Sequence, residues 1–290
     1  MRHFCLLLLL AFVAPLAAAA PADDLRQRGQ ALLRDGKLDD AAELLEQAVE
    51  LAPDDAAAHH LLGAAYGRKA GTGSLFAKMR LAGDVREHFE RAVALAPDEI
   101  EYRESLIQFY AQAPAVAGGG IDKARAQALE IGKRDAVRGR IAEGLIARIE
   151  GKPEQALVAY RAAYAERPDD ARLGVQIGLY LQELKRWDEA FGQFQLIVSR
   201  SPQAMPAWYQ LGRTAVLANA RHADGEAALK RYLGWTPTAQ DPPLAAAHWR
   251  LGMLYEQMQR TADARAQYQA ALQLDPEHAE AKAAMRKLKA

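Results

Sequence analysis

Beyond residue 20, apolar side chains recur every three or four positions, in segments separated by short polar turns. In the segment Ala171–Pro202, Leu173 and Ile177 belong to one apolar stripe, and Phe194 and Ile197 belong to a second. This spacing places each stripe on one face of an α-helix, because a helix repeats every 3.6 residues. The pattern therefore predicts two helices in this segment, and its recurrence predicts an all-α fold.

Glycine, alanine and proline recur in phase with these stripes. Gly144, Gly178 and Gly212 are separated by steps of 34 residues, as are Gly29 and Gly63. Small residues follow at Ala41, Ala156, Ala190 and Ala264, and segments close at Pro53, Pro97, Pro168, Pro202 and Pro276. Small residues let two helices approach closely, and proline prevents a helix from continuing. Each segment is therefore expected to be a helix pair that buries its apolar faces only by stacking on its neighbours.

These residue types, in this order and at this period, resemble the tetratricopeptide repeat family. The resemblance covers nearly the whole chain after residue 20. It implies a right-handed superhelical α-solenoid of about seven helix pairs over residues 21–290. The pairs are expected to begin near residues 21, 56, 100, 137, 171, 205 and 245, and a lysine-rich helix over 277–288 is expected to cap the last pair.

The first twenty residues follow a different pattern. A short basic start precedes the apolar stretch Phe4–Leu16, and alanines follow at 17–20. This layout predicts a cleavable secretory signal over 1–20, cut near Ala19 or Ala20, with an uncleaved membrane anchor as the alternative. The only cysteine, Cys5, lies too early in this segment to carry a lipid at a cleavage site. We therefore expect an exported, most simply periplasmic, protein that is not lipid-anchored.

The charges of the chain balance, with 37 basic and 37 acidic residues. A balanced chain provides no overall field that would attract nucleic acid or an anionic membrane. No segment after the signal has the length and apolarity of a membrane span. We therefore expect neither a nucleic-acid partner nor stable membrane insertion after signal cleavage.

No pattern of residues indicates catalysis, a cofactor or a metal. His59 and His60 are adjacent and should point to different sides of a helix, and the other histidines lack a second ligand one helical turn away. Acidic pairs such as Asp54–Asp55 and Asp169–Asp170 fall at helix starts, where they are expected to cap backbone N–H groups. The glycine run at 118–120 lacks the lysine and the preceding strand of a phosphate-binding loop, so an elongated turn is expected there. The sequence therefore predicts a protein that is not an enzyme.

Two insertions interrupt the repeat, at residues 67–84 and 111–120. In the first, Ser74 is expected to cap a helix from Leu75 through Val93 that overhangs its partner by more than two turns. Leu75, Phe76 and Met79 would form an apolar patch on the overhang. The patch is interpreted either as a second partner contact or as a surface that packs against the insertion at 111–120.

The first helix of each pair is expected to line a concave groove. Its N-terminal half would be polar, with Arg26, Gln30, His60, Glu104 and Gln108. Its C-terminal half would present Ile141, Leu145, Arg148, Val175, Leu179, Tyr209, Arg213, Trp249 and Met253. This mixture of apolar, aromatic and arginine side chains is typical of protein contacts, although the capping helix could instead cover Trp249 and Met253.

The groove predicts a scaffold or adaptor of the cell envelope that binds a protein or peptide. The alternative is a holdase-like chaperone for exported polypeptides. The sequence leaves the partner's identity and the oligomeric state open.

Overall fold

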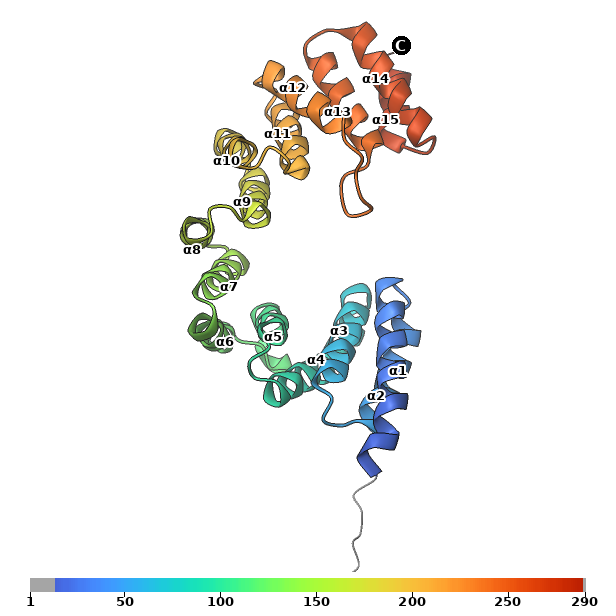
Figure 1. The fold of residues 1–290 in the computed structure, drawn as a ribbon, viewed down its shortest axis with the longest axis vertical. Helices are drawn as coiled ribbons and strands as arrows, with labels where there is room; N and C mark the ends of the chain where they lie inside the picture. The colour runs from blue at the N-terminus through green and yellow to red at the C-terminus, as the bar shows by residue number, and fades with distance from the viewer. Residues whose placement is uncertain (1–13, 289–290) are drawn as a thin grey trace, which may run out of the picture. The chain divides into compact units, whose positions relative to one another are not determined.

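The computed structural model describes residues 14–288, with side chains described from residue 21 onward. This part of the chain is entirely helical, apart from its turns, and contains fifteen α-helices and one short 3-10 turn (Figure 1). The helices are α1 (Ala14–Arg34), α2 (Leu38–Leu51), α3 (Ala56–Thr72), α4 (Leu75–Leu95), α5 (Ile100–Gln112), α6 (Ile121–Arg134), α7 (Ala136–Ile149) and α8 (Pro153–Glu166). They continue as α9 (Ala171–Glu183), α10 (Trp187–Arg200), α11 (Met205–Ala218), α12 (His222–Leu233), α13 (Leu244–Gln257), α14 (Thr261–Leu274) and α15 (Ala279–Lys287). The all-α prediction is confirmed.

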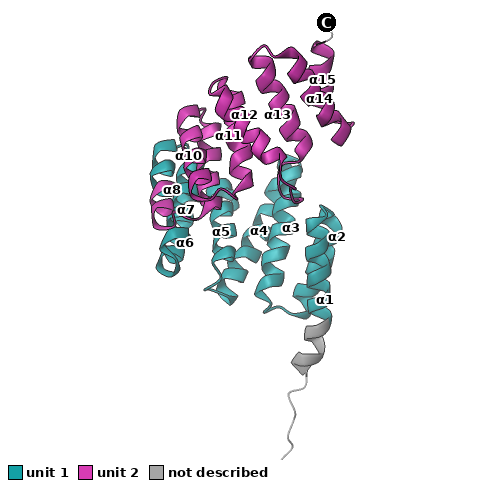
Figure 2. Ribbon diagram, turned by 45° about the horizontal axis from the view of Figure 1, so that its top comes forward, with its two compact units in different colours: residues 1–159 teal, residues 160–290 magenta. Residues whose placement is uncertain are grey.

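Consecutive helices pack as tandem pairs, α1 with α2, α3 with α4, α5 with α6, α9 with α10, α11 with α12 and α13 with α14, and α15 packs on α14. The chain divides into two compact units, residues 1–159 and 160–290, with the boundary inside α8 (Figure 2). Residues 1–13 of the predicted secretory signal lie outside the described residues, and α1 begins at Ala14. No described helix is long and apolar enough to cross a membrane.

Acidic residues start several of these helices. Asp55 accepts hydrogen bonds from the N–H groups of Ala57 and Ala58, at 2.9 and 3.1 Å, at the start of α3. Asp170 accepts one from Leu173 N–H at 3.0 Å at the start of α9. Each carboxylate satisfies backbone donors that have no partner within the helix. The predicted capping role of Asp55 and Asp170 is confirmed.

In α1, α3, α9, α11 and α13, the repeated glycine receives a large side chain of the second helix of the pair. A Cβ atom added at Gly178 would lie 2.4 Å from Cζ of Phe194, and Phe194 is fully buried. The same relation joins Gly29 to Leu45, Gly63 to Phe89, Gly212 to Leu229 and Gly252 to Tyr268, at 2.4–2.7 Å. The glycine is therefore needed because a neighbouring ring or leucine fills the space of its missing side chain.

The insertion at 67–84 lengthens both helices of the second pair. Helix α3 has 17 residues and α4 has 21, and only Gly73 and Ser74 connect them. Ser74 caps α4 as expected, accepting a hydrogen bond from Ala77 N–H at 3.3 Å. The predicted overhang of more than two turns is wrong, because α3 continues to Thr72 alongside the start of α4.

The insertion at 111–120 is a hydrogen-bonded turn. Its 3-10 segment, Ala115–Ala117, ends at Gly118, which has a left-handed φ of 88°. The N–H groups of Gly118, Gly119 and Gly120 donate to the carbonyl oxygens of residues 115, 114 and 110. Because these donors are already bonded within the chain, they do not form a phosphate cradle, and the expected elongated turn is confirmed.

Candidate functional site

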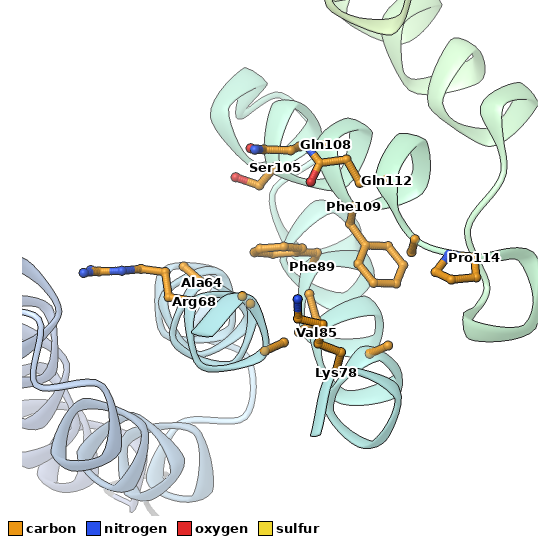
Figure 3. A pocket seen from close by; sticks show the side chains of 15 residues that line it. Ala64, Arg68, Lys78, Val85, Phe89, Ser105, Gln108, Phe109, Gln112 and Pro114 are labelled. Atoms are coloured by element: carbon orange, nitrogen blue, oxygen red, sulfur yellow. The ribbon is translucent and has the colours of Figure 1, made fainter. Parts of the chain in front are cut away.

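The first unit contains an open cleft of about 580 Å³ between α3 and α5, with α4 beneath it. Val85 and Phe89 of α4, both buried, and the half-buried Phe109 of α5 provide apolar surface (Figure 3). Side chains on the exposed face of α5 add polar groups, notably Gln108 and Gln112. The cleft therefore offers an apolar floor beside hydrogen-bonding amides, which is the composition of a peptide-binding surface.

Small residues on α3 create this opening. Ala64, Gly67, Ala70 and Gly71 line the α3 side and recur at helical spacing, so that Arg68 is the only bulky side chain that α3 contributes to the lining. The second insertion contributes to the same cleft at Pro114. Both departures from the regular repeat therefore contribute to one site.

The charges at the cleft are basic, and none of its lining residues is acidic. The ammonium group of Lys78 points into the space beside Phe89 (Figure 3). The guanidinium group of Arg68 points away and donates a hydrogen bond to the carbonyl oxygen of Leu33 on α1. Lys78 is therefore the cation available to a ligand in the cleft.

The sequence identified Gln108 on this surface but missed Phe89, Phe109 and Gln112. Phe89 and Phe109 look like ordinary core positions in the helical pattern, and only the small residues on α3 open a cleft beside them. The sequence signal that could have predicted the cleft was the spacing of the small residues Ala64, Gly67, Ala70 and Gly71 along α3.

The predicted groove residues of the second unit lie on α9, α11 and α13. Leu179 is 37% exposed, and Val175 and Met253 are partly buried. The guanidinium group of Arg213 donates to Oε1 of Gln182 at 2.6 Å. Burial, and then the nearby Arg250, lower the pKa of Arg213 from its ordinary value.

The prediction that Tyr209 lines the groove is wrong. Its side chain is only 7% exposed, and its ring lies 5.3 Å from the ring of Tyr232 on α12. Tyr209 was assigned to the groove from its place in the helical pattern. It is instead a packing residue, because the following helix covers it.

Trp249 lies close to the last helix. Its ring is 5.5 Å from that of His278, the residue that precedes α15, and the guanidinium carbon of Arg250 lies 4.2 Å from the Trp249 ring centre. The alternative interpretation of Trp249, in which the capping segment shields part of it, therefore has support.

The remaining predicted groove residues belong to α7 of the first unit. Ile141 and Leu145 are partly buried, and Leu145 packs against the core formed by α4 to α7. Arg148 is exposed. These three residues are separate from the cleft between α3 and α5.

Histidines in α3 and α4 make specific contacts. Nδ1 of His59 lies 2.9 Å from Nδ1 of His88, and Nε2 of His59 lies 3.0 Å from the carbonyl oxygen of Pro53. Because a carbonyl only accepts, Nε2 of His59 donates to Pro53, and the Nδ1–Nδ1 hydrogen bond holds one proton between the two rings. His60 points elsewhere and bonds to Ser105 Oγ at 2.8 Å. Within residues 14–288, no group of three or more possible metal ligands comes together.

We expect acidification to destabilise this histidine contact. Burial, and then the proximity of His59, lower the pKa of His88 below its usual 6.5, while Glu46, Asp84 and Glu87 act in the opposite direction. The unfolded chain therefore binds more protons than the folded chain as the pH falls below about 6.5, so stability decreases from there until the lowered pKa is passed. Thermal melting of the chain should occur at a lower temperature at pH 5.5 than at pH 7.

His88→Gln should reduce this dependence, because it removes the titrating group and retains a hydrogen-bond donor. His222→Gln, a change in the second unit, provides the matched control. Equal pH dependence in the wild type and His88→Gln would show that other groups dominate the effect.

Comparisons with known proteins identify the repeat. The "TPR repeat" family model matches residues 29–69, and tetratricopeptide repeat models match residues 141–205 and 245–278. The chain belongs to the tetratricopeptide repeat family. The comparison with curated proteins finds no match.

Solved structures show the same fold. A tetratricopeptide repeat protein from Parabacteroides merdae has a TM-score of 0.52 and 13% identity, with 93% of this chain and 100% of that chain covered. Yeast Tom70 has a TM-score of 0.66 and 14% identity, with 95% of this chain and 55% of that chain covered. A human IFIT1 dimer with PPP-AAAA has a TM-score of 0.52 and 18% identity, with 92% and 63% covered. The chain thus spans less than two thirds of the Tom70 and IFIT1 chains, and the likeness concerns the fold alone.

Proposed function

We propose that this protein is an interaction scaffold of the cell envelope that binds a segment of a partner protein in the cleft between α3 and α5. The observation that carries this proposal is the open cleft, which Phe89 and Phe109 line beside the exposed side chains of Gln108 and Gln112. Apolar side chains of the partner would contact the rings, and its backbone amides would bond to the glutamine side chains. The exposed face of α9 and α11, with Leu179 and Arg213, is proposed as a second contact surface.

A binding role is favoured over catalysis. Three groups of polar residues bond to other groups of the fold. Asp55 bonds to backbone N–H groups, His59 to His88, and Arg213 to Gln182. Export to the periplasm remains part of the proposal and rests on the N-terminal sequence pattern. The mixed polar and apolar lining favours one defined partner over the loose binding expected of a holdase.

The first experiment is cross-linking in living cells from a photoreactive residue in place of Gln112, followed by mass spectrometry. Gln112 lines the cleft and is exposed, whereas Tyr209 is buried and would report on the core. One dominant adduct is expected. Many exported proteins in similar amounts would instead indicate a holdase, and the absence of adducts would contradict the use of this cleft.

A substitution that fills the cleft tests the same proposal. Gly67→Phe should reduce the dominant adduct about tenfold, because its ring would occupy space that the partner needs. A Cβ atom at Gly67 has only an ordinary contact, 3.9 Å from Val85 Cγ1, so we expect the fold to tolerate the change. The adduct yield is measured by quantitative mass spectrometry.

The matched control is Gly83→Phe. Gly83 is an exposed glycine of α4 that does not line the cleft, and its added Cβ atom would meet no atom within 4 Å. The control should leave the adduct yield unchanged. Equal losses in both variants would mean that the effect is not specific to the cleft.

A further inference from the structure

The α3–α4 hairpin ends in an exposed apolar patch. At the start of α4, Leu75 is 77% exposed, Phe76 is 78% exposed and Met79 is 42% exposed. These side chains remain open to solvent, so the interpretation in which they pack against the insertion at 111–120 does not hold for Leu75 and Phe76. The turn contacts α4 further along, where Gly118 lies close to Arg86. The patch is therefore available to bind another surface.

The three apolar side chains share one side of the helix. At 100° per residue, Leu75, Met79 and Phe76 fall within an arc of about 100°. Lys78 flanks this arc beyond Leu75, and Arg80 flanks it beyond Phe76. An apolar stripe with a cation along each edge is the arrangement of a helix that lies at a membrane interface, since the cations can reach lipid headgroups while the stripe contacts the acyl boundary.

The charge of the hairpin end is strongly one-sided. Residues 68–80 contain four basic side chains, Arg68, Lys69, Lys78 and Arg80, and no acidic one. Lys69 pairs with Asp39 at 2.7 Å, but within residues 14–288 neither Lys78 nor Arg80 has an ion-pair partner. The balanced charge of the whole chain conceals this local excess.

The backbone at the hairpin end is also compatible with a headgroup layer. Gly73 N–H donates to the carbonyl oxygen of Ala70, and Lys78 N–H donates to that of Ser74. The Ser74 side chain accepts from Ala77 N–H. These internal hydrogen bonds reduce the cost of moving the turn out of water.

We propose that the end of the α3–α4 hairpin, residues 68–80, adsorbs to a bilayer surface that carries anionic phospholipid, with Leu75 and Phe76 entering the interface. Charge complementarity favours this occupant, because the patch combines unpaired cations with protruding apolar side chains. The contact is peripheral, since no described helix can span a bilayer. It would hold the scaffold at the membrane while the cleft binds its partner. Lys78 borders both surfaces, whereas Phe76 and Arg80 belong to the hairpin end alone.

The test is a flotation assay of the whole chain with two kinds of vesicle, one of phosphatidylcholine alone and one containing phosphatidylglycerol. The measured quantity is the ratio of the two partition coefficients. The ratio is used because the apolar stretch 4–16, if it is retained, would bind both kinds of vesicle equally and would therefore cancel. We expect at least about tenfold preference for the anionic vesicles at low salt, since each basic residue near such a surface contributes about fivefold. The preference should decrease at high salt.

Two variants locate the contact, and neither changes a residue that lines the cleft. Phe76→Ser should reduce binding to anionic vesicles about tenfold, because it removes an inserting ring. Arg80→Glu should reduce it at least about fivefold. The matched control is Leu129→Ser, because Leu129 is 63% exposed on α6 and lies outside the cationic hairpin end. Circular dichroism verifies that each variant is folded.

Two results would overturn the proposal. One is equal partitioning of the wild type into both kinds of vesicle. The other is anionic binding that Phe76→Ser leaves unchanged, which would mean nonspecific attraction to another part of the chain. Loss of a protein cross-link in Phe76→Ser, without any loss of vesicle binding, would assign the patch to a protein partner instead.

Discussion

Gly178→Leu is expected to lower the free energy of unfolding of the second unit by about 3 kcal/mol, near the upper end of typical overpacking costs. The first added atom would lie 2.4 Å from Cζ of Phe194. Phe194 is fully buried and so has no free space into which its ring could turn. Helices α9 and α10 would therefore have to separate, with loss of packing between them. Chemical denaturation followed by circular dichroism measures the change.

Gly192→Leu is the matched control, because Gly192 lies on α10 of the same helix pair. It is exposed, and an added Cβ atom there would meet no atom within 4 Å. Leucine favours a helix more than glycine does, so this variant should be neutral or more stable by up to about 1 kcal/mol. Similar destabilisation by the two variants would contradict the assigned packing.

Leu179→Asp tests whether Leu179 belongs to the groove surface or to the core. Leu179 follows Gly178 directly but is 37% exposed, so its replacement should change stability far less than Gly178→Leu. If the face of α9 and α11 binds a partner, Leu179→Asp should instead weaken that binding. A stability loss as large as that of Gly178→Leu would place Leu179 in the core.

Gly139→Ala is expected to destabilise the first unit by about 2 kcal/mol, although alanine normally favours a helix over glycine by about 1 kcal/mol. The added methyl group on α7 would lie 2.5 Å from Cα and 2.9 Å from N of Gly132 on α6. Both are backbone atoms, which cannot move aside by a side-chain rotation. The two helices would have to separate where their backbones cross.

Gly132 of α6, which faces Gly139, provides the control for Gly139→Ala. A Cβ atom at Gly132 would lie 3.9 Å from Cα of Gly139, which is an ordinary contact. Gly132→Ala should therefore be neutral or stabilising, even though the two glycines face each other. Thermal melting of both variants tests this difference in sign, and destabilisation by Gly132→Ala alone would contradict the geometry.

The surfaces were only partly predictable from the sequence. The helical pattern placed Leu179 and Tyr209 on the same groove, but Leu179 is accessible and Tyr209 is buried against Tyr232. The pattern gives the direction of a side chain around its own helix. It does not give the position of the next helix, which decides whether that side chain meets solvent.

The insertions show the same limit. The sequence located the cap at Ser74 and the apolar side chains of Leu75 and Phe76, because both depend on neighbouring residues. The continuation of α3 to Thr72 was not predicted, since the expected overhang of α4 required α3 to end earlier. The exposure of Phe76 depends on where the second insertion packs.

The sequence alone determined the all-α class, the tandem helix pairs and the positions of the small residues, because 3.6-residue periodicity, caps and a 34-residue repeat are encoded locally. Only the tertiary structure decided that Phe89 and Phe109 share an open cleft, that His59 meets His88, and that the end of the α3–α4 hairpin remains exposed. These features join side chains on different helices. They follow from how closely the helices approach, which the sum of packing contacts over both helices determines.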